Sequence, residues 1–132
     1  MPTIFYIQDC LKTAFFDQEQ VVRKTVSSVM SMIMVRGGFN SWPDLIQFLT
    51  DNLNTADATV CENSVHAISI VVEDCTSLFE QEEYVTLIEY MIKPIFNLLH
   101  PDAQRSSTIK AHAINIINLL LLTGCSSVKQ YT

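Results

Sequence analysis

The chain has 132 residues, of which 48% are hydrophobic and 17% are charged, and its formal net charge is −6. This composition is too apolar for a disordered chain, and the length suits a single domain. The eight Lys and Arg residues are scattered, whereas phosphate binding needs clustered cations, so we expect no direct contact with nucleic acid or an anionic membrane. A basic protein is the partner that the charge favours.

The frequencies of glycine and proline favour helices over sheets. Only three Gly and four Pro occur, and no long stretch alternates with period two, so we predict an all-α fold. The longest apolar run, Leu119-Leu120-Leu121-Leu122, is far shorter than the ~20 residues that span a bilayer. No signal peptide is expected, because residues 1–3 lead into mixed sequence without a basic region or a cleavage site.

Two helices are predicted in the first third of the chain. The first covers about residues 3–15 and ends before the polar turn at 17–20. The second continues to about Arg36, where Gly37-Gly38 forms a C-terminal stop signal. The spacing of apolar residues therefore predicts an antiparallel helix pair.

The clearest predicted helix start lies at Ser41. Asp44 follows three residues later and Pro43 falls in the first turn. These residue types at this spacing predict an N-capped amphipathic helix over about residues 42–53.

The partner of that helix is predicted over residues 57–75. Apolar residues recur there four and three residues apart, which places one stripe on one helical face: Cys61, Val65, Ile68, Val72 and Cys75. A polar stripe runs beside it at the same spacing: Glu62, His66, Ser69 and Glu73. Two such helices form an αα-hairpin, which needs neighbours to bury its whole apolar surface.

A third helix pair is predicted in the last part of the chain. Its first helix covers about residues 82–99, with a kink at Pro94, because proline removes one helical hydrogen bond. The second helix covers about residues 106–123, and Gly124 is its expected C-terminal cap.

The three pairs repeat one short pattern. An apolar residue followed by a charged one opens the second helix of each pair, at Val22-Arg23, Cys61-Glu62 and Ile109-Lys110. These spacings of about 40 to 50 residues are typical of helical solenoids. We therefore predict an α-solenoid of about three HEAT repeats, forming a single segment over residues 1–132, with approximate repeat bounds of 3–36, 42–76 and 82–123.

A HEAT solenoid often carries a ladder of turn carboxylates and cations. Asp17 with Arg23 fits the ladder, but Lys110 comes two residues late after Asp102, and Glu62 replaces the basic residue of the middle repeat. We therefore expect the ladder to be interrupted in the middle repeat.

Neither catalysis nor a cofactor is predicted. The four cysteines, Cys10, Cys61, Cys75 and Cys125, lack metal-ligand spacing, so we expect free thiols that pack as small hydrophobic side chains. No phosphate loop, nucleophile elbow or H-E-x-x-H motif occurs. We therefore expect that the chain is not an enzyme. The alternative, an all-α enzyme, would need a pocket with perturbed acid or base groups, and the sequence indicates no such pocket.

Short segments along the whole chain carry a family resemblance. They lie at residues 6–11, 22–26, 41–45, 61–65, 73–75, 92–94 and 109–113. With Trp42-Pro43-Asp44-Leu45 among them, the chain resembles the importin-β (karyopherin-β) family of nuclear import receptors. The pairs Cys61-Glu62 and Glu73-Asp74, with Lys110-Ala111-His112-Ala113, resemble the transportin branch of that family more closely.

The resemblance implies a transport function. Receptors of this family are long stacks of HEAT repeats that shuttle between cytoplasm and nucleus through the nuclear pore. Their N-terminal arch binds the small GTPase Ran in its GTP form, and the full-length receptor also binds nucleoporins and cargo proteins. This chain resembles only three repeats of the N-terminal arch, so cargo binding by it is doubtful and a Ran site would be incomplete.

The second helices of such repeats line the concave face, which makes the polar stripe the candidate partner-binding surface. Ran is a basic partner, so we predict that it contacts Glu62, His66, Glu73 and Asp74, with charge mainly setting rate and orientation. Ser69 is included in the candidate surface only because of its position on the stripe. The alternative is a solvated helix face. His112 is expected in the interior or between repeats, where a histidine would be sensitive to pH.

Two further expectations remain open. The predicted last helix is apolar on more faces than one neighbour can cover, so the segment is expected to self-associate through exposed solenoid ends. The alternative function is a generic HEAT-repeat scaffold for assembling protein complexes, without a response to Ran.

Overall fold

A computed structural model describes residues 3–79, 81 and 85–122. Throughout these residues the regular structure is helical, which confirms the all-α prediction. The described part contains no strand, and none of its helices is long and apolar enough to cross a membrane.

Seven α-helices follow one another along the described residues. They are α1 (Thr3–Ala14), α2 (Gln20–Gly37), α3 (Leu45–Asp51), α4 (Ala58–Asp74), α5 (Thr76–Phe79), α6 (Val85–Leu98) and α7 (Ser107–Leu122). Two 3-10 turns, η1 (Phe39–Ser41) and η3 (Pro101–Ala103), lie before α3 and α7. Six of the helices correspond to the three predicted pairs, and the short α5 was not predicted.

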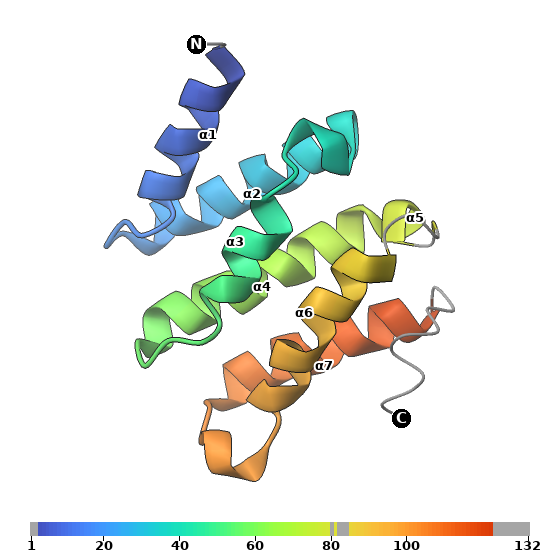
Figure 1. Ribbon diagram of the computed structural model, residues 1–132. Helices are drawn as coiled ribbons and strands as arrows, with labels where there is room; N and C mark the ends of the chain where they lie inside the picture. The colour runs from blue at the N-terminus through green and yellow to red at the C-terminus, as the bar shows by residue number, and fades with distance from the viewer. Residues whose placement is uncertain (1–2, 80, 82–84, 123–132) are drawn as a thin grey trace.

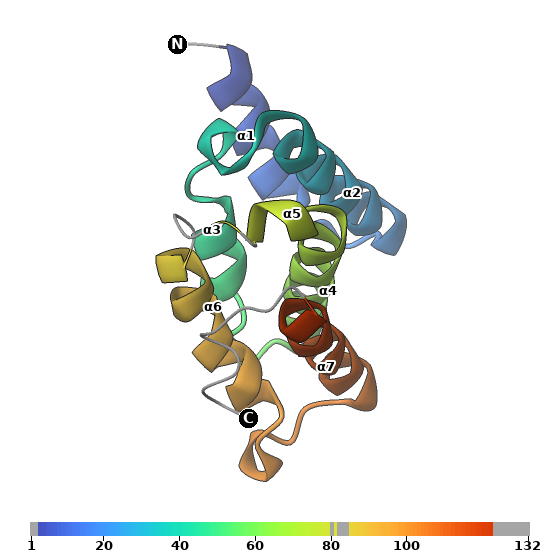
Figure 2. The same ribbon diagram turned by 90° about the vertical axis from the view of Figure 1, so that its right-hand side faces the viewer.

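The helices form two layers, as in a HEAT-like α-solenoid (Figure 2). One layer contains α2, α4 and α7, which run side by side in the same direction (Figure 1); we call it the second-helix layer. The other contains α1, α3 and α6 and is called the first-helix layer. The most extensive contacts join α4 to α2 on one side and to α7 on the other. The second-helix layer therefore forms the continuous part of the stack.

The core lies between the two layers and is densest around α4. Its apolar stripe is buried as predicted, with Cys61, Val65, Ile68 and Val72 fully shielded from solvent. Trp42 joins this core from the segment before α3, with 1% of its surface exposed. Burial on this scale is the main stabilising contribution in a small helical domain.

The end of α2 depends on glycine, as predicted. Gly38 follows the helix with a positive φ of 71°, and its N–H donates to the Met34 carbonyl at 2.8 Å. A Cβ on Gly37 would come within 2.5 Å of the Ser41 side chain. The first glycine allows a close approach and the second allows the left-handed turn.

The predicted start of the third helix is wrong. α3 begins at Leu45 rather than at residue 42, and Asp44 occupies the N-cap position without a side-chain capping bond. The Ser41 hydroxyl donates to the Gly38 carbonyl at 2.6 Å, because Ser41 ends the 3-10 turn η1. Ser41 therefore lies in the preceding turn, three residues before the N-cap position, and does not cap α3.

The start of α4 agrees with the sequence. Asp57 is its N-cap, and one carboxylate oxygen accepts hydrogen bonds from the Thr59 and Val60 amides at 2.9 and 3.2 Å. This bonding satisfies two amides that have no partner within the helix. The helix ends at Asp74, within a residue of the prediction.

The third pair also follows the prediction. α6 continues through Pro94 as a single helix, so there is no break at the proline, and the kink expected there stays a prediction. The expected helix start at 82–84 and the expected cap at Gly124 lie outside the described residues.

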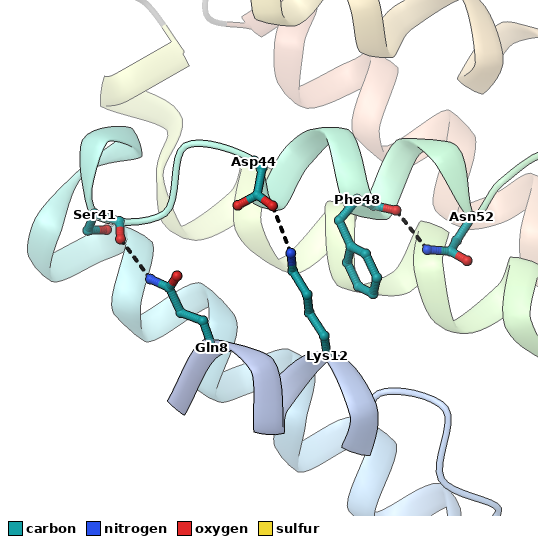
Figure 3. Close-up of polar contacts among 6 residues, drawn as sticks. All are labelled: Gln8, Lys12, Ser41, Asp44, Phe48 and Asn52. Atoms are coloured by element: carbon teal, nitrogen blue, oxygen red, sulfur yellow. Dashed lines mark hydrogen bonds and ion pairs between the residues drawn. The ribbon is translucent and has the colours of Figure 1, made fainter. Parts of the chain in front are cut away.

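Polar contacts join α1 to the segment that leads into α3 (Figure 3). Lys12 forms an ion pair with Asp44 at 2.7 Å, and the Gln8 amide donates to the Ser41 carbonyl at 2.9 Å. The Lys12 ammonium also lies 5.3 Å from the centre of the Phe48 ring. These contacts fix the first pair of helices against the second.

The expected ladder of carboxylates and cations takes another form. Arg23 donates to the backbone carbonyls of Asp17 and Gln18 in its own turn, at 2.9 and 2.8 Å. Between the second and third pairs, Arg105 donates to the Thr55 carbonyl at 2.8 Å. A cation outside the expected position therefore connects the turns of the second and third pairs.

Candidate partner-binding surface

The predicted polar stripe of α4 is divided by the structure. Glu62, Glu73 and Asp74 are exposed, whereas His66 is half-buried. Ser69 is buried, with 4% of its surface exposed, and its hydroxyl accepts a hydrogen bond from the Asn115 amide at 2.9 Å. The prediction that Ser69 contributes to an exposed surface is wrong, because α7 packs over this side of α4.

The three acidic residues do not form one cluster. Glu62 lies in the first half of α4 and Glu73 in its last turn, so they are about 16 Å apart along the helix at 1.5 Å per residue. Asp74 lies beside α2 and accepts a hydrogen bond from the buried Ser31 hydroxyl at 2.7 Å. The surface therefore has an acidic end at Glu73 and Asp74, and a separate end around Glu62 and His66.

A hollow of about 310 Å³ lies at the Glu62 end. It is open to solvent and crosses all three helices of the second-helix layer. Its lining residues are Gln20, Arg23 and Lys24 from α2; Thr59, Glu62, Asn63 and His66 from α4; and Thr108 and His112 from α7. We call it the three-helix hollow. Glu62 and His66 from the predicted site line it, and Glu73 and Asp74 do not.

Two histidines face each other across the α4 and α7 interface. The ring centres of His66 and His112 are 5.0 Å apart in an edge-to-face arrangement. Burial lowers the pKa of His66 below its usual value, the neighbouring His112 and Lys24 lower it further, and Glu62 opposes this change. His112 is half-buried between repeats, which agrees with its expected position.

Several polar residues that position this surface were not predicted. Asn63 is buried, and its amide donates to the Phe15 carbonyl at the end of α1, at 2.9 Å. Lys24 reaches the three-helix hollow from α2. The sequence gives one signal for Asn63: it is an amide next to the apolar stripe of a helix that has neighbours on both sides. Such an amide becomes buried and then needs a hydrogen-bonding partner.

The cysteines resemble structural side chains more than reactive ones. Burial raises the pKa of Cys61, and burial together with Asp74 raises the pKa of Cys75 to about 11. Both thiols are buried, but Cys10 is exposed, so its predicted role as a packed side chain is wrong. The reason is that its position on α1 has no neighbouring helix over it. Cys125 lies outside the described residues.

In the part of the chain that the structure describes, no group of three or more His, Cys, Asp or Glu side chains is arranged to hold a metal ion. What the second-helix layer offers is an extended polar surface with two differently charged ends, and such surfaces bind proteins or peptides.

The two-layer architecture defines the class of protein as an all-α solenoid of HEAT-like repeats. No protein-family model matches the sequence. The chain is 24% identical to transportin-1 of human and mouse over 121 residues, which is 92% of this chain. It is 21% identical to importin subunit beta-2 of Schizosaccharomyces pombe over 129 residues, or 97% of this chain. The chain is therefore weakly similar, along nearly its whole length, to parts of transportin-1 and importin subunit beta-2.

The relatives are far longer than this chain. The matched region makes up 13% of transportin-1 and 14% of importin subunit beta-2. A shorter match of 24% identity over 78 residues is found with transportin of Dictyostelium discoideum. The chain is therefore similar to a short segment of each of these proteins.

Proposed function

We propose that this chain is a non-enzymatic protein-binding segment related to the N-terminal arch of nuclear import receptors. Its second-helix layer would contact Ran in the GTP-bound form and thereby contribute to nucleocytoplasmic transport of proteins. Cargo and nucleoporins would be bound by the rest of a full-length receptor, which moves between cytoplasm and nucleus and through the nuclear pore. No cofactor takes part in this function.

The main support for this proposal is similarity along almost the whole chain. The match to transportin-1 covers 92% of the residues, so it extends over all three helix pairs rather than over one motif. The same repeats expose polar residues along α4 between α2 and α7. A layer of parallel helices with exposed polar ends suits the binding of an extended protein surface.

The acidic end of α4 is the part best suited to a basic partner. Glu73 and Asp74 are both exposed and adjacent. No salt bridge is present at either residue in the described part of the chain. Opposite charge on a partner would raise the association rate and fix its orientation more than it would raise affinity.

The test is calorimetric titration of the whole chain with Ran loaded with GTP and, separately, with GDP. We expect binding that prefers the GTP form and that weakens by about tenfold in the double variant Glu73→Lys, Asp74→Lys, because reversal turns attraction into repulsion. Asp9→Lys is the matched control, since Asp9 is an exposed acid on α1 in the first-helix layer.

The outcomes distinguish transport from the alternative. Selective binding that responds to the double variant and ignores Asp9→Lys supports the proposal. Equal binding of the two nucleotide forms contradicts the expected preference for the GTP form. If neither form binds, the same titration is repeated with the missing repeats of the arch restored, and no binding there contradicts a Ran-binding role and favours the generic HEAT scaffold.

A further inference from the structure

We propose that the three-helix hollow binds carboxylate side chains from an acidic segment of a protein partner. This site lies at the opposite end of α4 from Glu73 and Asp74, which were expected to attract basic partners. The inference concerns a second partner chemistry and does not depend on Ran binding.

The composition of the lining favours an anion. Eight of its nine residues have side chains that can donate hydrogen bonds, and Glu62 is the single residue that can only accept when ionised. The donors come from three helices, with Lys24 from α2, Thr59 from α4 and Thr108 from α7. Carboxylate oxygens accept several hydrogen bonds each, so they match a surface made mainly of donors.

Two permanent cations fix the charge of one wall. Arg23 lines the hollow while its Nη1 atom donates to the carbonyls of Asp17 and Gln18, which hold its side chain in place. Lys24 is the adjacent residue and is exposed. A fixed cation beside a mobile one binds carboxylates well, because little conformational entropy is lost at the fixed group.

The direction of the helices adds to this charge. Gln20, Thr59 and Thr108 lie in the first turns of α2, α4 and α7, so the positive ends of three helix dipoles point toward the same hollow. Asp57 already accepts from the first free amides of α4. The Ser106 hydroxyl accepts from the Ile109 amide of α7, whereas α2 has no side-chain capping bond. Most of the donors around the hollow are therefore side chains spread over three helices, which suits an extended acidic segment better than a single free phosphate.

The paired histidines make this site dependent on pH. His66 shares the hollow with Arg23 and Lys24 from α2 and with Glu62 from its own helix, and its ring contacts that of His112 from α7. Without a ligand, burial, His112 and Lys24 lower the pKa of His66. A bound carboxylate favours the protonated rings, so binding must strengthen as the pH falls and the imidazoles become charged.

The size of the hollow limits what can enter. Its volume of about 310 Å³ is at the lower end of the range of about 300 to 1,000 Å³ found for small-molecule sites. It can hold side chains but not a folded domain. The acidic segment would cross the three helices and place its carboxylates among the donors.

The experiment measures fluorescence anisotropy of a labelled hexaglutamate peptide with the whole chain, and uses hexaglutamine as the neutral probe. We expect only hexaglutamate to bind, and to bind more tightly at about pH 6 than at about pH 8. In parallel, NMR signals of the His66 and His112 rings should shift with hexaglutamate, and the titration midpoint of His66 should move to higher pH.

Variants locate the binding to this site. Lys24→Gln and the double variant His66→Gln, His112→Gln should each weaken binding by about fivefold or more, and the double variant should also remove the pH dependence. Lys93→Gln is the matched control, because Lys93 is an exposed cation on α6 in the other layer. Circular dichroism of each variant verifies that the fold is intact.

Three results would overturn the inference. Equal binding of hexaglutamine would show that charge is not recognised. Equal weakening by Lys93→Gln and Lys24→Gln would show general attraction to cations rather than a site. Inorganic phosphate that shifts both histidine rings as strongly as the peptide, at the same concentration, would make this a small-anion site and not a surface for an acidic segment.

Discussion

The middle and the ends of the solenoid differ in burial. α4 has neighbours on both sides and buries nine of its 17 residues, whereas α2 buries five of 18 and α7 five of 16. The outer side of α2 instead exposes Val21, Met32 and Val35, and that of α7 exposes Ile114 and Leu122. Helices with similar apolar periodicity therefore bury different numbers of residues, because each helix buries only the side chains that its neighbours cover.

The largest effect is expected from a cavity in the middle of the stack. Ile68 is fully buried in α4, so Ile68→Ala should lower the free energy of unfolding by about 3 kcal/mol, through lost burial and a residual cavity. Urea unfolding followed by circular dichroism measures this loss.

Ile114→Ala provides the matched comparison at the end. Ile114 has 56% of its surface exposed on α7, so its removal should cost less than about 0.5 kcal/mol. Similar losses for the two variants would contradict the difference between middle and ends.

The reactivity of the cysteines tests whether the middle of the stack is closed to solvent. The pKa of Cys75 is raised from 9.0 to about 11, so at about pH 8 its thiolate fraction is about a hundredfold smaller than that of an ordinary thiol. In a Cys125→Ser chain, a thiol reagent should label the exposed Cys10 first and the buried Cys61 and Cys75 only after unfolding. Rapid labelling of all three in the native protein would show that the middle of the stack is open.

Asn63 tests the polar part of the middle repeat. Asn63→Ala removes the donor to the Phe15 carbonyl, and should cost about 2 kcal/mol because a buried carbonyl loses its partner. Asn118→Ala is the control, since Asn118 is exposed on α7. Thermal unfolding of both variants measures the difference, and an equal change in the two would contradict a structural role for the buried amide.

The smallest effect concerns association between molecules. The exposed apolar residues at the two ends should cause weak self-association, which sedimentation velocity would detect as a concentration-dependent mass. Met32→Glu on α2 should weaken this association by about tenfold, whereas Thr86→Glu on α6 should not. Sedimentation as a monomer at all concentrations would contradict the expectation.

Local sequence patterns predicted the helices well where the signal was short-range. Gly37-Gly38 and Asp57 act through their immediate neighbours, and both ended or began a helix as expected. Ser41 had an equally clear pattern but failed, because residues 39–41 form the 3-10 turn η1 and α3 begins only at Leu45. A capping motif therefore predicts a helix start only if the residues that follow it continue directly into the helix.

The candidate site was harder to predict, since it depends on packing between repeats. The exposure of Glu62, Glu73 and Asp74 agrees with the stripe, but periodicity within one helix could not reveal that α7 would cover Ser69. The approach of Lys24 and His112 to His66 likewise depends on the stacking of α2, α4 and α7. Such contacts between distant residues leave no local pattern.

Hydrogen exchange of the whole chain with and without Ran in the GTP form tests the central claim most directly. We predict slower exchange in α4, strongest in its last turn at Glu73 and Asp74, with smaller changes in the adjoining parts of α2 and α7. The first-helix layer should change little. Protection concentrated in α1, α3 and α6, or no protection anywhere, would contradict a partner-binding role for the second-helix layer.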